Sequence, residues 1–277
     1  MSTSAGLPDV EAVIVARGSD GLLEAAIASL EGQVAPGRVI VVDAAGTEGS
    51  GPVAVELASQ VRVIAAPSGN LAAANNAGIT ATSGEFVLLL SPDAALEDRS
   101  LRSLVARMHS NRTAAIVAPK LVDPEGGVVE GSFGQFPTLG RAVVGIMNRF
   151  AHRISGGRLR PVHDIAVTTP VDWASGTCML VRRSAIHKAG AMDEGFSLRF
   201  YDVEWCHRMA DNGFTVLIEP QACCVQSRDT SNEAETPAAQ KAYRDAFFRY
   251  CKLYRQRGLA LLGRVGFDPG RLMGGRG

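Results

Sequence analysis

The 277-residue chain has no net formal charge, and its 46% hydrophobic and 20% charged residues are ordinary for a folded globular protein. Its length allows one large α/β domain or two small ones. The sequence has no apolar run near the ~18 residues of a membrane span and no basic-then-apolar leader, so we expect a cytoplasmic protein. The balanced charge predicts no nucleic-acid partner, and the five cysteines lack the spacing of a metal site.

Apolar strands and helices alternate through the first 118 residues. The patterns predict strands at 10–16, 39–43, 61–65, 85–90 and 114–118, and helices at 21–32, 52–59, 70–82 and 98–110. This alternation is typical of an α/β fold with a doubly wound, mostly parallel sheet and right-handed crossovers.

Two of the predicted strands end in an aspartate. Asp43 closes the second strand, and Asp93 follows the apolar run 86–90 after Pro92, which cannot continue a sheet ladder. Ligands of open α/β sheets bind at the carboxyl ends of the strands, so both acids should lie on one binding edge. At that edge Asp93 either holds a divalent metal with a diphosphate or simply opens a turn.

After residue 118 the regular alternation stops. Glycines and prolines predict a loop or hairpin over 119–138, and 154–170 shows no clear period. Residues 139–152 predict an amphipathic helix, packed on the domain in preference to a membrane surface. Order resumes with strands predicted at 177–181, 215–218 and 222–225 and helices at 184–189 and 202–212.

The C-terminal part of the chain is strongly basic. From residue 236 onward nine Lys and Arg residues stand against two acids, a net charge of about +7. Basic and aromatic residues are interspersed in a helix predicted over 237–257. This helix either rests on an anionic membrane, peripherally on the inner face of the plasma membrane, or packs back on the domain. The glycine-rich tail after Gly266 is predicted to be flexible.

Five short motifs follow one another at residues 41–43, 71–79, 89–93, 172–183, and 192–196 with 200–206. In this order and spacing they resemble the family 2 glycosyltransferases, inverting enzymes of the GT-A fold, and most of all the bacterial branch that contains rhamnosyltransferases. The resemblance covers most of the chain. It implies a Rossmann-like nucleotide-sugar-binding half over 1–118, an acceptor-binding and catalytic half over 119–235, and a basic helix with a flexible tail over 236–277.

The resemblance also implies a reaction and a set of site residues. The reaction moves a sugar, rhamnose or another hexose, from a UDP- or dTDP-linked donor to a hydroxyl of a cell-envelope glycan or polyprenyl-linked acceptor. Asp202 matches the general base, Asp93 the ligand of a divalent cation (Mg2+ or Mn2+), and Asp43 the contact of the nucleotide base. The other positions in the matching segments are Ala16 and Asn75 on the nucleotide side and Trp173, Ser175 and Gly176 on the acceptor side.

The chain departs from the family pattern at several polar positions. Ser91 replaces the first acid of the D-x-D motif, Tyr201 replaces the Glu before the base, and Gln226 replaces a late His. The site therefore has fewer metal and phosphate ligands than the family pattern provides. Arg17 and Arg228 are candidates to contact the diphosphate instead, since a guanidinium can take over part of a metal's electrostatic role.

These departures leave two functional classes open. The retained Asp43, Asp93 and Asp202 favour an active sugar transferase, whereas the lost polar residues favour a degenerate member that binds a nucleotide or a partner without catalysis. A nucleotidyltransferase should carry a glycine-rich phosphate loop after the first strand, and 13–22 offers only two glycines. From the residues alone, Asp202 can also be a helix cap and Trp173 a core residue.

Overall fold

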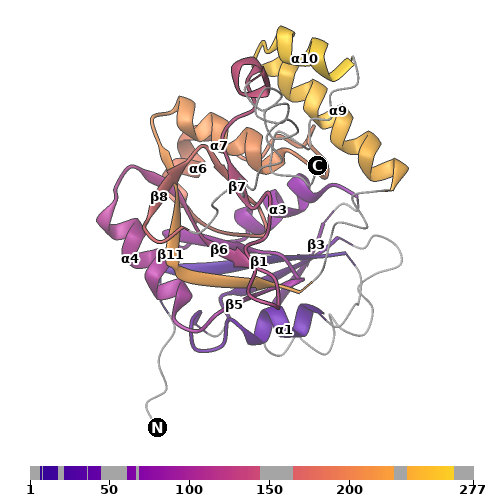
Figure 1. The fold of residues 1–277 in the computed structure, drawn as a ribbon. Coiled ribbons are helices and arrows are strands. Elements are labelled where there is room, and N and C mark those ends of the chain that lie inside the picture. The colour runs from indigo at the N-terminus through magenta and orange to yellow at the C-terminus, as the bar shows by residue number, and fades with distance from the viewer. Residues whose placement is uncertain are drawn as a thin grey trace.

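The computed structural model describes residues 7, 9–17, 22–35, 37–44, 61–66, 69–143, 165–227 and 236–264. A sheet crosses the middle of the molecule, with helices on both of its faces (Figure 1). The sheet is mixed but mostly parallel, so the α/β class predicted from the sequence is confirmed. Within the described ranges, no helix is long and apolar enough to cross a bilayer.

The sheet brings together strands from the whole chain. Its first four strands in spatial order are parallel, and α1(Leu22–Ala28) and α3(Leu71–Thr80) lie on two of the connections between them. An antiparallel strand from the second half, β10, lies between two strands of the first half, so both halves share one sheet. The order is β3(Arg62–Ala65), β2(Val39–Asp43), β1(Val10–Ala16), β4(Phe86–Leu90), β10(Cys178–Arg182), β6(Ala114–Val122), β11(Thr215–Gln226) and β5(Ala94–Leu96), with β8(Thr169–Val171) also on β11.

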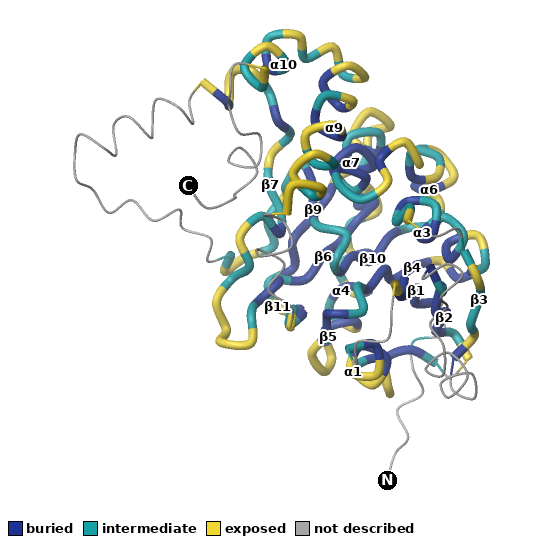
Figure 2. The backbone as a smooth tube through the Cα atoms, turned by 90° about the vertical axis from the view of Figure 1, so that its right-hand side faces the viewer, coloured by how far each residue is buried: buried dark blue, intermediate teal, exposed yellow. Residues whose placement is uncertain are grey.

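Both faces of the central strands are buried, as Figure 2 shows for the middle of the molecule. In β1, Val13 and Val15 enter one hydrophobic cluster, while Ala12 and Ile14 enter a second cluster on the opposite face. Strands buried on both faces are apolar without alternation, which explains the sequence of β4. The first face is covered by α3, α6(Arg183–Ala189) and α7(Tyr201–Asp211), and the second by α1 and α4(Ser100–Ser110). Outside α7, α9(Pro237–Leu253) and α10(Arg257–Arg264) extend the cluster of the first face.

The C-terminal helix differs from its prediction. Instead of one helix over 237–257, α9 ends at Leu253, and Arg255 turns the chain with a left-handed φ of 53° before α10. Phe247 and Tyr250 of α9 are fully buried against the domain, and the Tyr250 hydroxyl shares a 2.6 Å hydrogen bond with His207 Nδ1 of α7. Of the two arrangements predicted for this segment, α9 therefore adopts the one that packs back on the domain.

Other differences concern short strands. The two strands predicted at 215–218 and 222–225 form the single strand β11, whose register shifts between Glu219 and Cys223 because Pro220 cannot donate to the ladder. The elements β5, β8, β7(Phe133–Gly134) and β9(Trp173–Ala174) are too short to show a period in the sequence. The helix predicted at 52–59, most of that at 139–152, and the tail after Gly266 lie outside the described residues.

Helix α3 packs tightly against the sheet at Gly78. A Cβ added to Gly78 would lie 2.9 Å from Val42 Cγ2 of β2 and closer still to Val13 Cγ1 of β1. Both valines belong to the buried cluster on this face of the sheet. The absence of a side chain at Gly78 therefore sets the distance between α3 and the two strands that end beside Asp43.

We predict that Gly78→Ala lowers the free energy of unfolding by about 1–3 kcal/mol, because the added methyl group overpacks the core. Ala also gains about 1 kcal/mol of helix propensity, which offsets only part of this cost. Urea denaturation measures the difference. Gly140→Ala is the matched control, since a Cβ added there meets nothing within 4 Å. An equal loss of stability in both variants would contradict the packing explanation.

Candidate active site

The predicted binding edge forms where β1, β2 and β4 end. Asp43 is the last residue of β2 and pairs in register with Ala16, the last residue of β1. β4 ends two residues earlier along the edge, at Leu90 opposite Ile14, and the chain then turns through Asp93. Asp43, Ala16 and the turn at Asp93 thus lie along one edge of the sheet, as the sequence predicted. Ala16 is buried, and its carbonyl accepts the Ala44 N–H at 2.8 Å.

The carboxylate of Asp93 is only 8% exposed and is held by two of the residues that depart from the family pattern. The Ser91 hydroxyl donates to its Oδ1, and Gln226 Nε2 donates to its Oδ2 at 3.1 Å. Both substituted side chains thus converge on the one acid that the D-x-D motif retains. In the described part of the chain, no group of three or more His, Cys, Asp or Glu side chains gathers into a metal site.

A tight turn at 175–177 connects Asp93 to Asp202. The Thr177 carbonyl accepts the Ser91 N–H at 2.7 Å, and the Gly176 N–H donates to Asp202 Oδ2 at 3.1 Å. Ser175 stabilises the turn, since its Oγ lies 3.0 Å from Thr177 Oγ1 and accepts the Thr177 N–H at 3.2 Å. The predicted acceptor-side residues Ser175 and Gly176 therefore join the loop of the predicted metal ligand to the predicted base.

Position 176 requires glycine because the Tyr201 ring occupies the space of a side chain. A Cβ on Gly176 would overlap the Tyr201 hydroxyl and lie 2.9 Å from its ring carbons. Tyr201 begins α7 and stands where the family pattern has a Glu, so its ring, and not a second carboxylate, packs beside Asp202. Phe200, which precedes it, has a left-handed φ of 65°, a strained conformation for a side chain of this size.

Asp202 lies in the first turn of α7 and is partly buried. Burial raises the pKa of the Asp202 carboxyl above its ordinary value. The N–H groups of Gly176 and Val203 and the charge of Arg199 lower the pKa, but they offset only part of the rise. The N-cap position of α7 belongs to Phe200, so Asp202 is not the N-cap of this helix. A carboxylate with a raised pKa is a stronger proton acceptor, which suits a general base.

Four charged side chains act electrostatically on the Tyr201 hydroxyl. Burial raises the pKa of Tyr201 far above its ordinary value; the negative charges of Asp202 and Asp93 add to the rise, and the positive charges of Arg199 and Arg17 oppose it. Arg17 is exposed at the end of β1, in keeping with a place at the binding edge. Arg199 was missed by sequence reasoning, although a basic residue three positions before the predicted base was the available signal.

The remaining predicted residues have structural contacts of their own. Trp173 is only 2% exposed; its Nε1 donates to the Gln135 carbonyl at 3.2 Å, and its ring packs on Gly134. Asn75 is buried in α3 and donates to the carbonyl of Leu71 at 2.8 Å. Arg228 lies outside the described residues.

Two other asparagines of the α3 motif position the loop before the base helix. The Asn70 side chain caps α3 by accepting the Ala73 N–H at 3.0 Å and donates to the Glu194 carbonyl at 2.8 Å. Asn76 exchanges hydrogen bonds with the backbone of Met192, at 2.9 and 3.0 Å. The alanine-rich motif at 71–79 therefore fixes the chain that leads into Asp202.

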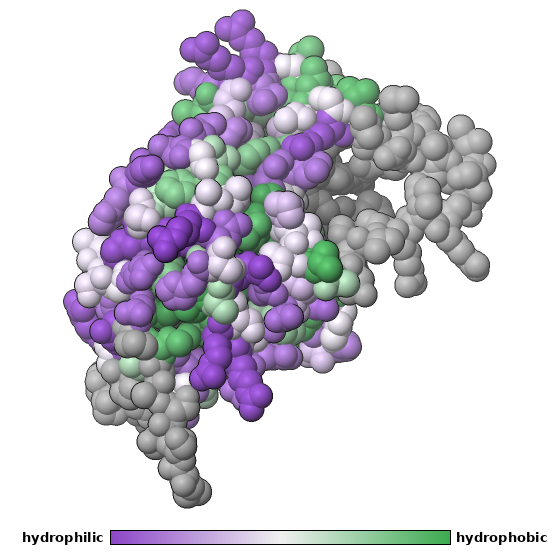
Figure 3. All heavy atoms as spheres, turned by 90° about the vertical axis from the view of Figure 1, so that its left-hand side faces the viewer, coloured by the Kyte–Doolittle hydropathy of each residue, from purple (hydrophilic) through white to green (hydrophobic). Residues whose placement is uncertain are grey.

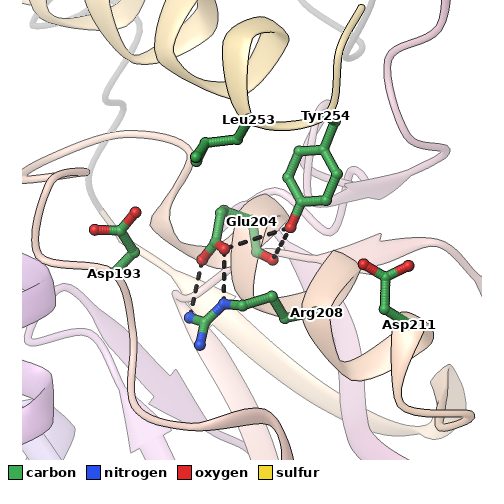
Figure 4. Close-up of a pocket in the computed structure, with 6 residues that line it drawn as sticks. All are labelled: Asp193, Glu204, Arg208, Asp211, Leu253 and Tyr254. Atoms are coloured by element: carbon green, nitrogen blue, oxygen red, sulfur yellow. Dashed lines mark hydrogen bonds and ion pairs between the residues drawn. The ribbon is translucent and has the colours of Figure 1, made fainter.

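A separate hollow opens between α7 and the end of α9 (Figure 4). The carboxylate of the buried Glu204 receives Arg208 Nε and Nη2 at 2.7 and 2.9 Å. Arg208 also donates to the carbonyls of Ala189 and Ala191, which ties α7 to the chain after α6. The charges of Glu204 and Arg208 neutralise each other, and none of the predicted site residues lines the hollow. We therefore interpret this ion pair as a structural contact that holds α7 in place.

Comparison with known proteins places the chain among glycosyltransferases. The family described as Glycosyl transferase family 2 matches residues 11–190. An N-acetylglucosaminyl-diphospho-decaprenol L-rhamnosyltransferase of Mycobacterium tuberculosis is 29% identical over 208 residues, 68% of this chain and 65% of that protein. Rhamnosyltransferase WbbL of Escherichia coli K12 is 25% identical over 184 residues, 66% of each. The match thus spans just under two thirds of the length of these relatives.

Solved structures show the fold. GalNAc-T7 with UDP, GalNAc and Mn2+ superimposes with a TM-score of 0.63 at 14% identity, over 89% of this chain and 48% of that chain. The mannosyltransferase PcManGT of Pyrobaculum calidifontis with GDP-Man and Mn2+ gives 0.56 at 16% identity, over 98% and 68%. The fold is therefore the GT-A fold of glycosyltransferases. The family match covers more than half of the sequence, and the chain belongs to glycosyltransferase family 2, which confirms the resemblance.

We predict that Asp202→Asn lowers the rate of sugar transfer by about 10²–10⁴-fold, because an amide cannot take the proton of an acceptor hydroxyl. Radiolabelled sugar transfer measures this loss. Asp211→Asn, an exposed position at the other end of α7, is the matched control. An unchanged rate in Asp202→Asn would exclude Asp202 as the base.

The same variant should be as stable as the wild type at pH 7, or more stable. The pKa of Asp202 in the folded state lies above the unfolded value of about 3.9, so the folded state holds this proton more tightly. Its contribution to stability is full below about pH 4 and is lost as the pH rises through the folded-state pKa. Asn avoids the loss, and thermal melts at pH 4 and pH 7 test the sign.

Proposed function

We propose that this protein moves a hexose, with rhamnose the first candidate, from a UDP- or dTDP-linked donor to a hydroxyl of a cell-envelope glycan or lipid-linked acceptor. The observation that carries the proposal is the hydrogen-bonded turn at 175–177, which joins the Asp93 loop to Asp202. The relatives named as rhamnosyltransferases support the sugar, and the relative that acts on a diphospho-decaprenol-linked N-acetylglucosamine supports the acceptor class.

In the proposed mechanism the acceptor hydroxyl attacks the anomeric carbon from the face opposite the nucleoside diphosphate. The new carbon–oxygen bond forms while the bond to the diphosphate oxygen breaks, and the electron pair leaves with the diphosphate. Asp202 takes the hydroxyl proton, and one such base suffices because a single displacement inverts the anomeric centre. Its raised pKa predicts that the rate falls once the pH drops below that value.

The leaving diphosphate requires positive charge. Mg2+ is commonly bound by one or two carboxylates together with substrate phosphates, so Asp93 beside the Ser91 hydroxyl fits a Mg2+ or Mn2+ ion that the donor helps to hold. Such an ion would stabilise the charge of the departing diphosphate. Arg17 and Arg199 act on the same Tyr201 hydroxyl as Asp93 and Asp202, and they supply further positive charge to this region.

The alternative is a non-catalytic member that binds a nucleotide or a partner. The observation in its favour is that Ser91, Tyr201 and Gln226 stand where the family pattern has ligands. Against it, Ser91 and Gln226 donate to Asp93, and Tyr201 packs on the glycine that bonds Asp202. A site in which the substituted residues still hold the two carboxylates in place favours the active enzyme.

We expect calorimetric titration to show that UDP or dTDP binds in the presence of Mg2+ or Mn2+, and that Asp93→Asn weakens this binding by about tenfold or more through the loss of one charged ligand. Asp98→Asn, an exposed acid five residues on, is the control and should bind normally. If neither nucleotide binds the wild type under any condition, the non-catalytic alternative prevails.

We further propose that α10 and the short helix at 139–143 rest on an anionic membrane. Arg257, Leu261 and Arg264 form one exposed stripe along α10, with Leu261 62% exposed. Leu139 lies against Gly258 of α10 and is itself exposed, as is Val143 one turn further along. Figure 3 has hydrophobic and strongly hydrophilic residues side by side at the end of the molecule where Figure 1 places α10. Apolar side chains flanked by arginines are typical of interfacial helices.

Sedimentation with vesicles tests this surface. The wild type should bind vesicles that contain anionic lipid, more weakly at high salt, and Leu261→Glu should lower the partition coefficient about tenfold through the lost apolar burial and added charge. Val167→Glu, at another exposed apolar residue, is the matched control and should bind normally. If the wild type binds no vesicles at low or high salt, the membrane proposal is wrong, and the basic face of α10 is exposed to solvent.

A further inference from the structure

An open groove runs between α9 and the loop 195–199, which leads into the base helix. Its volume is about 470 Å3, within the range of sites that hold a small ligand. The α9 residues on this groove recur at helical spacing, so one face of the helix forms its wall. The lining residues on which the argument depends are Gly195, Arg199, Lys241, Asp245 and Arg249.

The charged groups of the groove are predominantly positive. Arg199, Lys241 and Arg249 line it with a single acid, Asp245, which pairs with Lys241 at 3.0 Å on an exposed part of α9. Arg249 donates to both carboxylate oxygens of Asp193, at 2.8 and 3.0 Å. Burial raises the pKa of Asp193, but the hydrogen bonds from Arg249 and from the Gly195 N–H, together with the charges of Arg249 and Arg208, outweigh it and lower the pKa below its ordinary value.

Small residues line the groove beside Lys241 and Arg249, so that it stays open to solvent. Gly195 has no side chain because the Arg249 guanidinium occupies that space, and Arg249 also lies over the Phe196 ring, 5.2 Å from its centroid. Alanines form the rest of the α9 wall. Lys241 and Arg249 are thus held beside an unobstructed surface, an arrangement suited to a bulky anion with several acceptor oxygens.

The groove also lies next to the proposed base. Arg199 lines it and is three residues before Asp202, and its charge acts on the carboxyl of Asp202 and on the hydroxyl of Tyr201. The groove therefore adjoins the proposed base through Arg199, whereas the proposed donor diphosphate site is at the edge formed by β1, β2 and β4.

We propose that this groove binds the diphosphate of a lipid-linked sugar acceptor, with Lys241 and Arg249 as its cationic ligands and Arg199 between it and the base. The inference rests on the proposed function, because it assigns the negative charge to the acceptor of that reaction. It adds a specificity: the enzyme distinguishes a sugar carried on a diphosphate from the same sugar on a neutral aglycone.

The test compares two acceptors of equal chain length, an N-acetylglucosaminyl diphosphate lipid and a neutral alkyl N-acetylglucosaminide. Lys241→Glu should raise the KM for the diphosphate acceptor about tenfold, through the loss of a charge-assisted contact, while the KM for the neutral acceptor and the rate of donor hydrolysis stay unchanged. Arg244→Glu makes the same charge change at an exposed position of α9 outside the groove and should alter neither KM. Equal effects on both acceptors, or equal effects of both variants, would overturn the assignment.

Two further experiments separate this proposal from the failure of the proposed function and from binding of lipid headgroups. If the wild type transfers to neither acceptor, the proposed function fails. Calorimetry with inorganic diphosphate at saturating UDP or dTDP then tests whether the groove binds anions. Binding that Lys241→Glu abolishes supports an anion site, and no binding to the wild type overturns it. If Lys241→Glu weakens binding to vesicles of anionic phospholipid but leaves the KM for the diphosphate acceptor unchanged, the groove serves lipid headgroups and the proposal is wrong.

Discussion

The site depends on one backbone hydrogen bond, from Gly176 N–H to Asp202 Oδ2. Asp202 belongs to α7, whereas Gly176 lies in a turn whose next residue bonds the loop of Asp93. Through this turn, two carboxylates that are more than a hundred residues apart in the sequence are held by one rigid piece of backbone. The bond needs a glycine, because the ring of Tyr201 fills the space that any side chain at position 176 would take.

The fold and the edge of the site could be predicted because they depend on local sequence patterns. Apolar runs that end in Asp43 and Asp93 fix the strands and their acids, and the parallel crossover rule brings both acids to one edge. The short strands could not be predicted, since two or three residues show no period. The break between α9 and α10 arises where Arg255 adopts a left-handed conformation. It could not be predicted, because no glycine or proline marks this position in the sequence.

The long-range contacts of the site were beyond sequence reasoning for a different reason. Ser91 and Gln226 looked like lost ligands, because a motif records which residues are absent and not what the present ones contact. In the structure both donate to Asp93, each to a different carboxylate oxygen. Asn76 had no predicted role of its own beside Asn75, yet its side chain bonds Met192 in the chain that leads to α7. These roles follow from tertiary packing alone.

Arg199 links the two sides of the proposed reaction. Its charge partly opposes the burial that raises the pKa of Asp202, so the base stays ionised over a wider pH range than burial alone would allow. Burial disfavours the charged form of the Asp202 carboxylate, while the N–H groups of Gly176 and Val203 still donate to it, a balance that is common at catalytic acids and bases. If an acceptor diphosphate occupies the groove, its negative charge compensates part of the positive charge of Arg199, so Arg199 lowers the pKa of Asp202 less. The base would then become more basic when the acceptor is bound, which couples acceptor recognition to proton abstraction through a single side chain.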